Sequence, residues 1–263
     1  MKLASTVLAL IALFSSPLWA QTIPIVGDDN AKPKNWLSED GTAMGIHIAL
    51  LEEISNRTGF EFTDELVPWK RALVLSQAGK AAIIGFSKTK EREEHWHYSA
   101  PLFFDELVFV ARKGHEFEYS GLESLVGRRV GIKSGATYGD DFEEAKRAGH
   151  LVAVETTDRE DQLRMLVAGR VDLVLLSPGA IALETVIAEN EWLREHKDDF
   201  KVLSPPYKLD PNYVGFPKTM DIPGALEMIN DAIHNMNVDG TYAKIVSAET
   251  KTIIDELRSV LAR

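Results

Sequence analysis

The chain has 263 residues, no cysteine and a formal net charge of −11 at pH 7. An excess of acidic over basic residues argues against nucleic acids or anionic membranes as partners, because both repel a negative surface. Without cysteine the chain can form no disulfide framework, and no lipid can be attached at an N-terminal cysteine.

The N-terminus is predicted to be a cleaved signal peptide. Met1-Lys2 is followed by the apolar stretch Leu8–Phe14 and by Ser15–Ala20, which suits cleavage after Ala20. A membrane anchor is the weaker interpretation, because the apolar stretch is short and Pro17 interrupts its end. We therefore expect a soluble protein exported to the periplasm, with residues 1–20 removed.

The first part of the mature chain alternates between predicted strands and helices. Ile23–Val26 and Ala81–Ile84 are short apolar stretches typical of buried strands, and 60–62 alternates in polarity as a strand does. A helix is predicted over 45–58, where apolar residues recur on one face, and a second opens at Pro68, an allowed first-turn position. This order is typical of a parallel sheet with crossover helices.

A second unit of similar pattern follows, and the chain then returns. Phe103–Arg112 is a long strand-like stretch that leaves the first unit. The second unit has predicted strands at 129–133, 152–155 and 171–176, with helices between and after them. The stretch 202–216 is strand-like and rich in proline, and a helix opening near Asp221 is followed, after Gly240, by two helical pieces.

These patterns predict an α/β fold of two doubly wound sheets joined by a two-strand hinge. The first lobe would comprise 21–108 and 205–263, and the second 109–204. Ligands of open parallel sheets bind at the carboxyl ends of the strands. Here those ends are Asp28-Asp29, Gly85–Thr89, Ser134–Thr137 and Ser177, which we expect to meet in a cleft between the lobes.

The stretch from Gly85 to Arg92 has the composition of an anion site. Ser87 and Thr89 offer short hydroxyl groups, and Arg92 offers a planar fork that matches a carboxylate. The alternative is a surface loop in which Arg92 pairs with the neighbouring glutamates at 91, 93 and 94. The residues alone leave both possibilities open.

The chain resembles the periplasmic solute-binding proteins of family 3, the amino-acid-binding components of ABC transporters. The resemblance extends from about Ile23 to Ile245 and depends on the order and spacing of several short motifs. They include Gly85-x-Ser87-x-Thr89-x-Glu91-Arg92, Tyr98-Ser99-x-Pro101, Val130-Gly131-Ile132-x-Ser134-Gly135 and Gly169-x-Val171-Asp172. The implied fold is the two-lobed periplasmic binding protein of type II.

The resemblance implies a set of ligand-binding residues. The arginine that holds the ligand carboxylate in this family falls on Arg92, and its backbone and hydroxyl partners fall on Gly85, Ser87, Ala136 and Thr137. The turn from Ser134 to Thr137 is expected to start a helix, whose free amide groups and dipole would hold the anion from the second lobe.

Other positions fit the family less closely. The acid of the first strand falls on Asp29, and the aromatic that covers the ligand falls near Trp69. The family's amine-binding aspartate is replaced by Ser177, so either another acid binds an amine or the ligand is not a standard α-amino acid. Packing is the alternative role for each tryptophan, and the roles of Trp36 and Arg71 stay open.

The expected function is capture of a small carboxylate-bearing solute, an amino acid or related organic acid, for a membrane permease. By resemblance we expect a monomer with no cofactor, no metal and no catalytic residue. Two alternatives remain. One is an enzyme like cyclohexadienyl dehydratase, for which Asp29 is the candidate proton donor. The other is a periplasmic sensor of a small solute.

Overall fold

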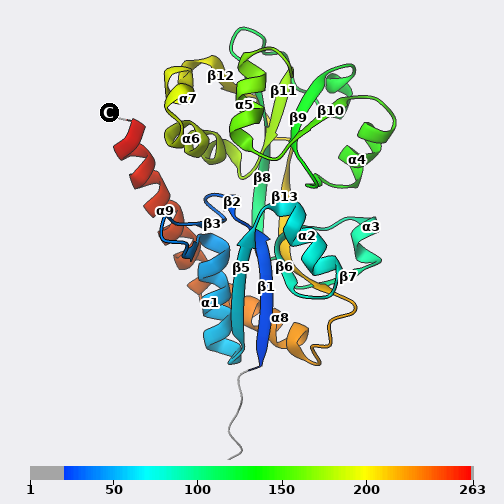
Figure 1. Ribbon diagram of the computed structural model, residues 1–263, viewed down its shortest axis with the longest axis vertical. Coiled ribbons are helices and arrows are strands. Elements are labelled where there is room, and N and C mark those ends of the chain that lie inside the picture. The colour runs from blue at the N-terminus through cyan, green and yellow to red at the C-terminus, as the bar shows by residue number, and fades with distance from the viewer. Residues whose placement is uncertain (1–20, 262–263) are drawn as a thin grey trace, which may run out of the picture.

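The computed structural model describes residues 21–261 and shows an α/β protein of two lobes, one above the other in Figure 1. The predicted signal peptide lies outside the described residues. Within 21–261 no helix is long and apolar enough to cross a membrane. The strands follow one continuous path in the order β10-β9-β11-β8-β13-β6-β1-β5, with β12 and β7 paired beside it.

The first lobe is built on three parallel strands. β1 (Thr22–Asp28) lies between β5 (Glu61–Val67) and β6 (Ala82–Ser87) and pairs with both in parallel, which is the parallel pairing that the alternation of elements predicted. The crossover helices are α1 (Ile46–Thr58), which ends at Gly59 in the left-handed conformation, and α2 (Trp69–Gln77). Apolar side chains cover both faces of this sheet, and the carboxyl ends of its strands are directed toward the second lobe in Figure 1.

Short helices and strands lie in the loops of the first lobe. The segment after β1 contains a small antiparallel sheet of β2 (Asn30–Ala31), β3 (Asn35–Leu37) and β4 (Ala43–Met44). After β6 come α3 (Lys90–Glu93), a single turn, and β7 (Trp96–Tyr98), which pairs with β13. Thr89 caps α3 by accepting a hydrogen bond from the backbone N–H of Arg92 at 3.2 Å, which places that arginine beside the end of β6.

Two long antiparallel strands connect the lobes. β8 (Phe103–Arg112) pairs with β13 (Lys208–Pro217) over Phe103–Leu107, then with β11 from Val108 and with β12 from Val110. The chain therefore passes from one lobe to the other between Leu107 and Val108, and both strands run through the centre of Figure 1.

The second lobe repeats the parallel arrangement. Its central strands are β9 (Arg129–Lys133), β10 (Val152–Thr156) and β11 (Leu173–Leu176), with β12 (Phe200–Val202) on β8. The helices α4 (Asp140–Arg147), α5 (Arg159–Val167), α6 (Gly179–Glu189) and α7 (Glu191–Glu195) surround them, with 3-10 turns η1 (Leu122–Leu125) and η2 (Lys197–Asp199). Two apolar clusters, one on each face, hold this sheet in place.

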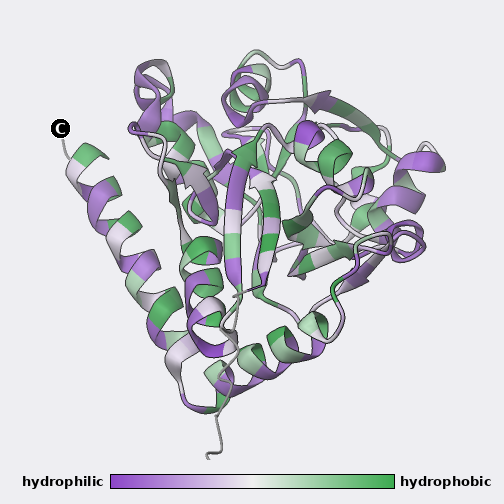
Figure 2. Ribbon diagram, turned by 60° about the horizontal axis from the view of Figure 1, so that its bottom comes forward, coloured by the Kyte–Doolittle hydropathy of each residue, from purple (hydrophilic) through white to green (hydrophobic). Residues whose placement is uncertain are grey.

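The C-terminal segment forms α8 (Ala225–Val238) and α9 (Thr241–Leu261). The prediction of two separate pieces after Gly240 is wrong, because α9 is one continuous helix. It packs on α1 and α8 and then contacts α6 of the second lobe, where Ile253 and Leu257 meet Ala188. Hydrophobic and hydrophilic residues alternate along α9 in Figure 2, as expected of a helix with one buried face. The C-terminal helix α9 therefore belongs to the first lobe and also contacts the second lobe.

Candidate functional site

The ends of four strands converge on a cavity between the lobes. Its walls include Asp28 at the end of β1, Ser87 at the end of β6, Lys133 at the end of β9 and Ser177 just after β11. Seven of the eight predicted ligand-binding residues line it, namely Gly85, Ser87, Trp69, Arg92, Ala136, Thr137 and Ser177. Their role toward a ligand stays a prediction, but the fold brings them to one place.

Arg92 is held by backbone carbonyls and by an aromatic face. Its Nη1 donates to the Ser87 carbonyl at 2.9 Å, and its Nη2 donates across the cleft to the Gly135 carbonyl at 3.3 Å. The guanidinium carbon lies 4.3 Å from the centre of the Phe86 ring. Burial lowers the pKa of the guanidinium to about 10.

Arg92 does not pair with the glutamates beside it in sequence. No carboxylate of residues 21–261 lies within 4.0 Å of its guanidinium nitrogens. Glu93 pairs instead with Lys88 at 2.6 Å. The surface-loop alternative considered from the sequence is therefore wrong.

The turn from Ser134 to Thr137 differs from the expectation. α4 begins only at Asp140, after Gly139, so this turn does not start the helix and the helix dipole is not directed from it. The N–H groups of Ser134 and Ala136 donate to the carbonyls of Thr156 and Lys133. Within the described chain the N–H groups of Gly135 and Thr137 have no acceptor, and of these two residues Thr137 lines the cavity.

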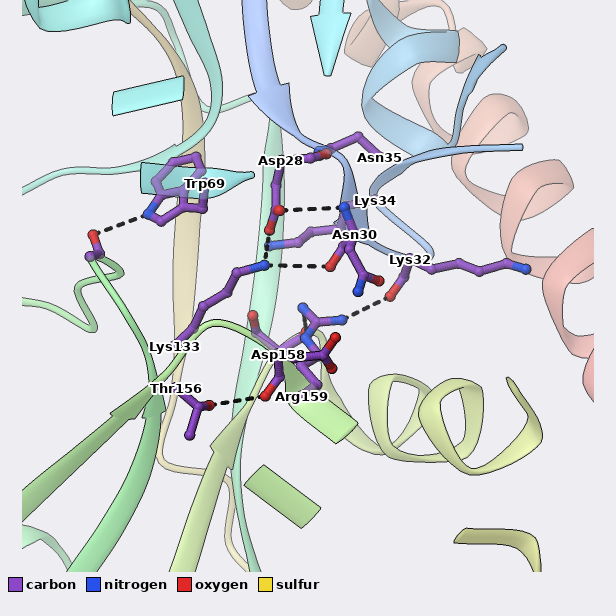
Figure 3. A network of polar contacts seen from close by, with 12 residues as sticks. Asp28, Asn30, Lys32, Lys34, Asn35, Trp69, Lys133, Thr156, Asp158 and Arg159 are labelled. Carbon is purple, nitrogen blue, oxygen red and sulfur yellow. Dashed lines mark hydrogen bonds and ion pairs between the residues drawn. The ribbon is translucent and has the colours of Figure 1, made fainter. Parts of the chain in front are cut away.

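Several polar contacts join the lobes around the cavity (Figure 3). Lys133 of the second lobe forms an ion pair with Asp28 of the first. Trp69 donates from Nε1 to the Gly135 carbonyl at 3.0 Å, and its ring packs in the first lobe beside Phe86. These contacts show that the lobes are closed over the cavity.

Asp29 lies apart from the cavity, whereas Asp28 lines it. Successive residues of a strand point to opposite sides, so only one of two adjacent acids faces the cleft. Asp29 lies beside Lys32 and Trp36 in a separate surface hollow, and burial raises its pKa. Trp36 contacts Lys32, whose Nζ is 5.1 Å from the centre of the ring.

Arg71 is also outside the cavity. Its side chain is exposed and lies 3.8 Å from Glu65 on the first lobe. Among the described residues no group of three or more His, Cys, Asp or Glu side chains is placed to bind a metal ion.

The sequence matches a known family over most of its length. Residues 23–248 match the model of the bacterial extracellular solute-binding proteins, family 3. The chain belongs to this family. Its relatives are amino-acid-binding periplasmic proteins of ABC transporters, which confirms the resemblance drawn from the motifs.

Individual relatives of this solute-binding protein are distant. The histidine-binding periplasmic protein of Escherichia coli K12 is 26% identical over 255 residues, with 90% of this chain and 93% of the relative covered. An ancestral arginine-binding protein bound to arginine superposes with a TM-score of 0.70 at 23% identity, covering 86% of this chain and 97% of that one. These identities support the fold and the family rather than a particular ligand.

One solved structure with the same fold is related to an enzyme. It is an ancestral amino-acid-binding protein described as a precursor of cyclohexadienyl dehydratase, with a TM-score of 0.66 and 18% identity, covering 86% of this chain and 94% of that one. At that identity the similarity concerns the fold alone.

The cavity of this solute-binding protein contains charged residues that the motifs did not single out. They are Lys34, Asp105, Lys133, Arg159 and Asp210, together with the amide side chain of Gln162. Lys34 and Asp105 form a buried ion pair at 2.5 Å, and Lys34 also donates to Asn212 at 3.2 Å. Lys133 is the last residue of the predicted strand 129–133, and Arg159 lies at the start of the helix predicted after the strand 152–155. These positions are the signal that could have identified them.

Proposed function

We propose that this solute-binding protein captures a small carboxylate-bearing solute, an amino acid or related organic acid, in the cavity between its lobes. The carboxylate would be bound by Arg92, with Ser87 and the Thr137 amide as further donors. The closed protein would deliver the solute to the membrane permease of an ABC transporter.

The main support for this proposal is the environment of the Arg92 side chain, which is largely buried and charged but has no counter-ion among the described residues. It lines the cavity and keeps its positive charge, yet its partners are two carbonyl oxygens and an aromatic ring. A buried cation without a counter-ion is costly, and a planar carboxylate offers the charge and the geometry that the guanidinium lacks. Arginine has five N–H donors, so a carboxylate can bind while the two carbonyl contacts persist.

Closure follows from contacts that exist only when the lobes meet. Trp69 and Arg92 of the first lobe both reach the Gly135 carbonyl of the second. A solute that contacts both walls adds to these contacts in the closed state only, and so shifts the population toward closure. A permease that recognises the closed form would then distinguish loaded from empty protein.

The test is titration calorimetry of Arg92→Gln with a ligand found by thermal-shift screening of amino acids and organic acids. Removing one partner of a buried charge pair costs on the order of 2–5 kcal/mol, so we expect affinity to fall by roughly thirtyfold to several thousandfold. Arg71→Gln is the matched control, because Arg71 is an exposed arginine of the same lobe. Unchanged affinity in Arg92→Gln would show that the carboxylate binds elsewhere.

A second candidate is a dehydratase acting on a carboxylate-bearing ring. The observation in its favour is Asp210, which lines the cavity and whose pKa is raised by burial, as a proton donor requires. Asp29, the donor considered from the sequence, is not part of the cavity wall. Incubation with prephenate or arogenate, followed by detection of the aromatic product, tests this candidate directly.

A further inference from the structure

The charges around the cavity do not balance. Two cations are matched by ion pairs, Lys34 with Asp105 and Lys133 with Asp28. Of the ionisable side chains that remain in the wall, two are arginines and one is an aspartate, Asp210. The cavity therefore has one more positive than negative group, and both arginines lack an ion-pair partner among the described carboxylates.

Arg159 is the arginine that the proposed carboxylate site does not use. It is the first residue of α5, which Asp158 caps by accepting from the N–H of Glu160 at 2.7 Å. Its side chain turns into the cleft, as Figure 3 shows, where Nη1 donates to the Lys32 carbonyl at 3.2 Å and Nη2 to the Ser177 carbonyl at 2.8 Å. The residue is only 9% exposed. Carbonyl oxygens orient a guanidinium but do not neutralise it.

Gln162 is an independent sign that a polar group is missing at this place. It follows Arg159 by one turn of α5, so both side chains lie on the same face of the helix. Gln162 is 1% exposed and lines the cavity, and neither its amide nitrogen nor its amide oxygen has a partner in the described part of the chain. Buried amides are almost always hydrogen-bonded, because an unmade bond costs free energy that water no longer supplies.

Ser177 completes the group from a neighbouring strand end. Arg159, Gln162 and Ser177 all belong to the second lobe, and all line the same cavity as Arg92 of the first. Nearby Lys133 adds positive charge. Burial is the largest cause that lowers the pKa of the Lys133 ammonium group, and the positive charge of Arg159 lowers it further. Donors outnumber acceptors on this side of the cavity.

From this arrangement we propose a second anion subsite formed by Arg159, Gln162 and Ser177, so that the solute carries two carboxylates. This inference rests on the proposed function, in which Arg92 binds the first carboxylate. The solute is then a short diacid, either an acidic amino acid or a plain dicarboxylic acid. Its first carboxylate binds Arg92 in the first lobe, and its second binds Arg159 and the Gln162 amide in the second.

The geometry makes the second subsite part of closure. Arg159 reaches the Lys32 carbonyl of the first lobe, and Lys133 reaches Asp28, so both cations stand where the lobes meet. A second carboxylate placed between them lowers the repulsion between the two cations. A monoacid of the same length leaves Arg159 and Gln162 unsatisfied and is therefore discriminated against.

The experiment is calorimetric titration of the parent protein with matched pairs of acids. Glutamate is compared with glutamine, aspartate with asparagine, and succinate and 2-oxoglutarate with their monoamides. We expect at least one diacid to bind about thirtyfold or more tightly than its monoamide, as for the loss of one partner of a buried charge pair. Comparing glutamate with glutarate then tells an amino diacid from a plain one.

Variants test which residues are responsible for the preference for a diacid over its monoamide. Arg159→Gln is expected to weaken the diacid by about thirtyfold or more and the monoamide much less, because the monoamide loses only the interlobe contact of Arg159 with the Lys32 carbonyl. Gln162→Leu should act in the same direction to a smaller extent. Arg159→Lys keeps the charge and should retain part of the preference. Arg170→Gln, an exposed arginine of the same lobe, is the control. Thermal unfolding of each variant checks that the fold is kept.

The outcomes separate the two proposals. If Arg92→Gln abolishes binding but Arg159→Gln keeps the full preference for diacids, the second subsite is wrong and the proposed function stands. If Arg92→Gln binds as the parent does, the proposed function itself fails. Equal affinity of the parent for diacid and monoamide, or no binding of any diacid at millimolar concentration, overturns the second subsite without any variant.

Discussion

The ion pair between Asp28 and Lys133 is the contact through which closure can be tested most sharply. Its side chains are only 9% and 15% exposed, and they belong to different lobes. Asp28→Asn removes the negative charge and leaves Lys133 as a buried cation whenever the lobes are closed. Opening restores water to Lys133, so the variant avoids the penalty by opening rather than by unfolding.

The size of the effect follows from that burial. Removing one partner of a buried ion pair costs about 3–5 kcal/mol when the remaining charge stays buried. The closed state should therefore lose about 3 kcal/mol relative to the open state, which is on the order of a hundredfold in their ratio. Because the proposed solute site is complete only in the closed state, the apparent affinity for the solute should fall by a similar factor, while the melting temperature changes little.

Small-angle scattering and calorimetry measure the two quantities. The radius of gyration of Asp28→Asn should exceed that of the parent at a solute concentration that closes the parent. The double variant Asp28→Asn with Lys133→Met should recover closure, because no unpaired charge is then buried. Asp172→Asn is the control, since Asp172 pairs with Arg129 inside one lobe at 2.7 Å. Closure and affinity that are unchanged in Asp28→Asn would refute this reasoning.

Three further predictions concern single contacts. Trp69→Phe loses the Nε1 hydrogen bond to the Gly135 carbonyl, so calorimetry should show solute affinity reduced severalfold, as about 1 kcal/mol implies, with unfolding unchanged. Leu257→Ala opens a cavity where α9 meets α6 and should lower the free energy of unfolding in urea by about 2–4 kcal/mol, whereas Val260→Ala at an exposed position should change it little. Burial raises the pKa of Asp210 above its ordinary value, so the charged carboxylate destabilises the folded state. Stability is therefore lost as the pH rises from the ordinary pKa of an aspartate through the raised pKa of Asp210. Asp210→Asn should be more stable than the parent in urea at about pH 7, with a flatter pH dependence of the free energy of unfolding.

The sequence by itself predicted the order of the main strands and helices and singled out Arg92, which lines the cavity. Strand and helix alternation in the first lobe follows from local apolar periodicity, which depends on near neighbours only. Arg92 could be singled out because Ser87 and Thr89 stand within the same short stretch, and Thr89 does cap the turn that carries it. The length of α9 was missed, because two pieces were predicted after Gly240 where the structure has one helix that packs against α1, α8 and α6.

Only the tertiary structure decided which charges share the cavity. Arg159 and Lys133 belong to the second lobe and meet Lys32 and Asp28, more than a hundred positions earlier, through lobe closure. Whether Asp28 or Asp29 faces the cleft depends on how the strand is rotated within the sheet, and the local sequence does not determine that rotation. Charge balance in a cavity is a property of side chains brought together from distant segments, so periodicity and spacing along the chain do not determine it.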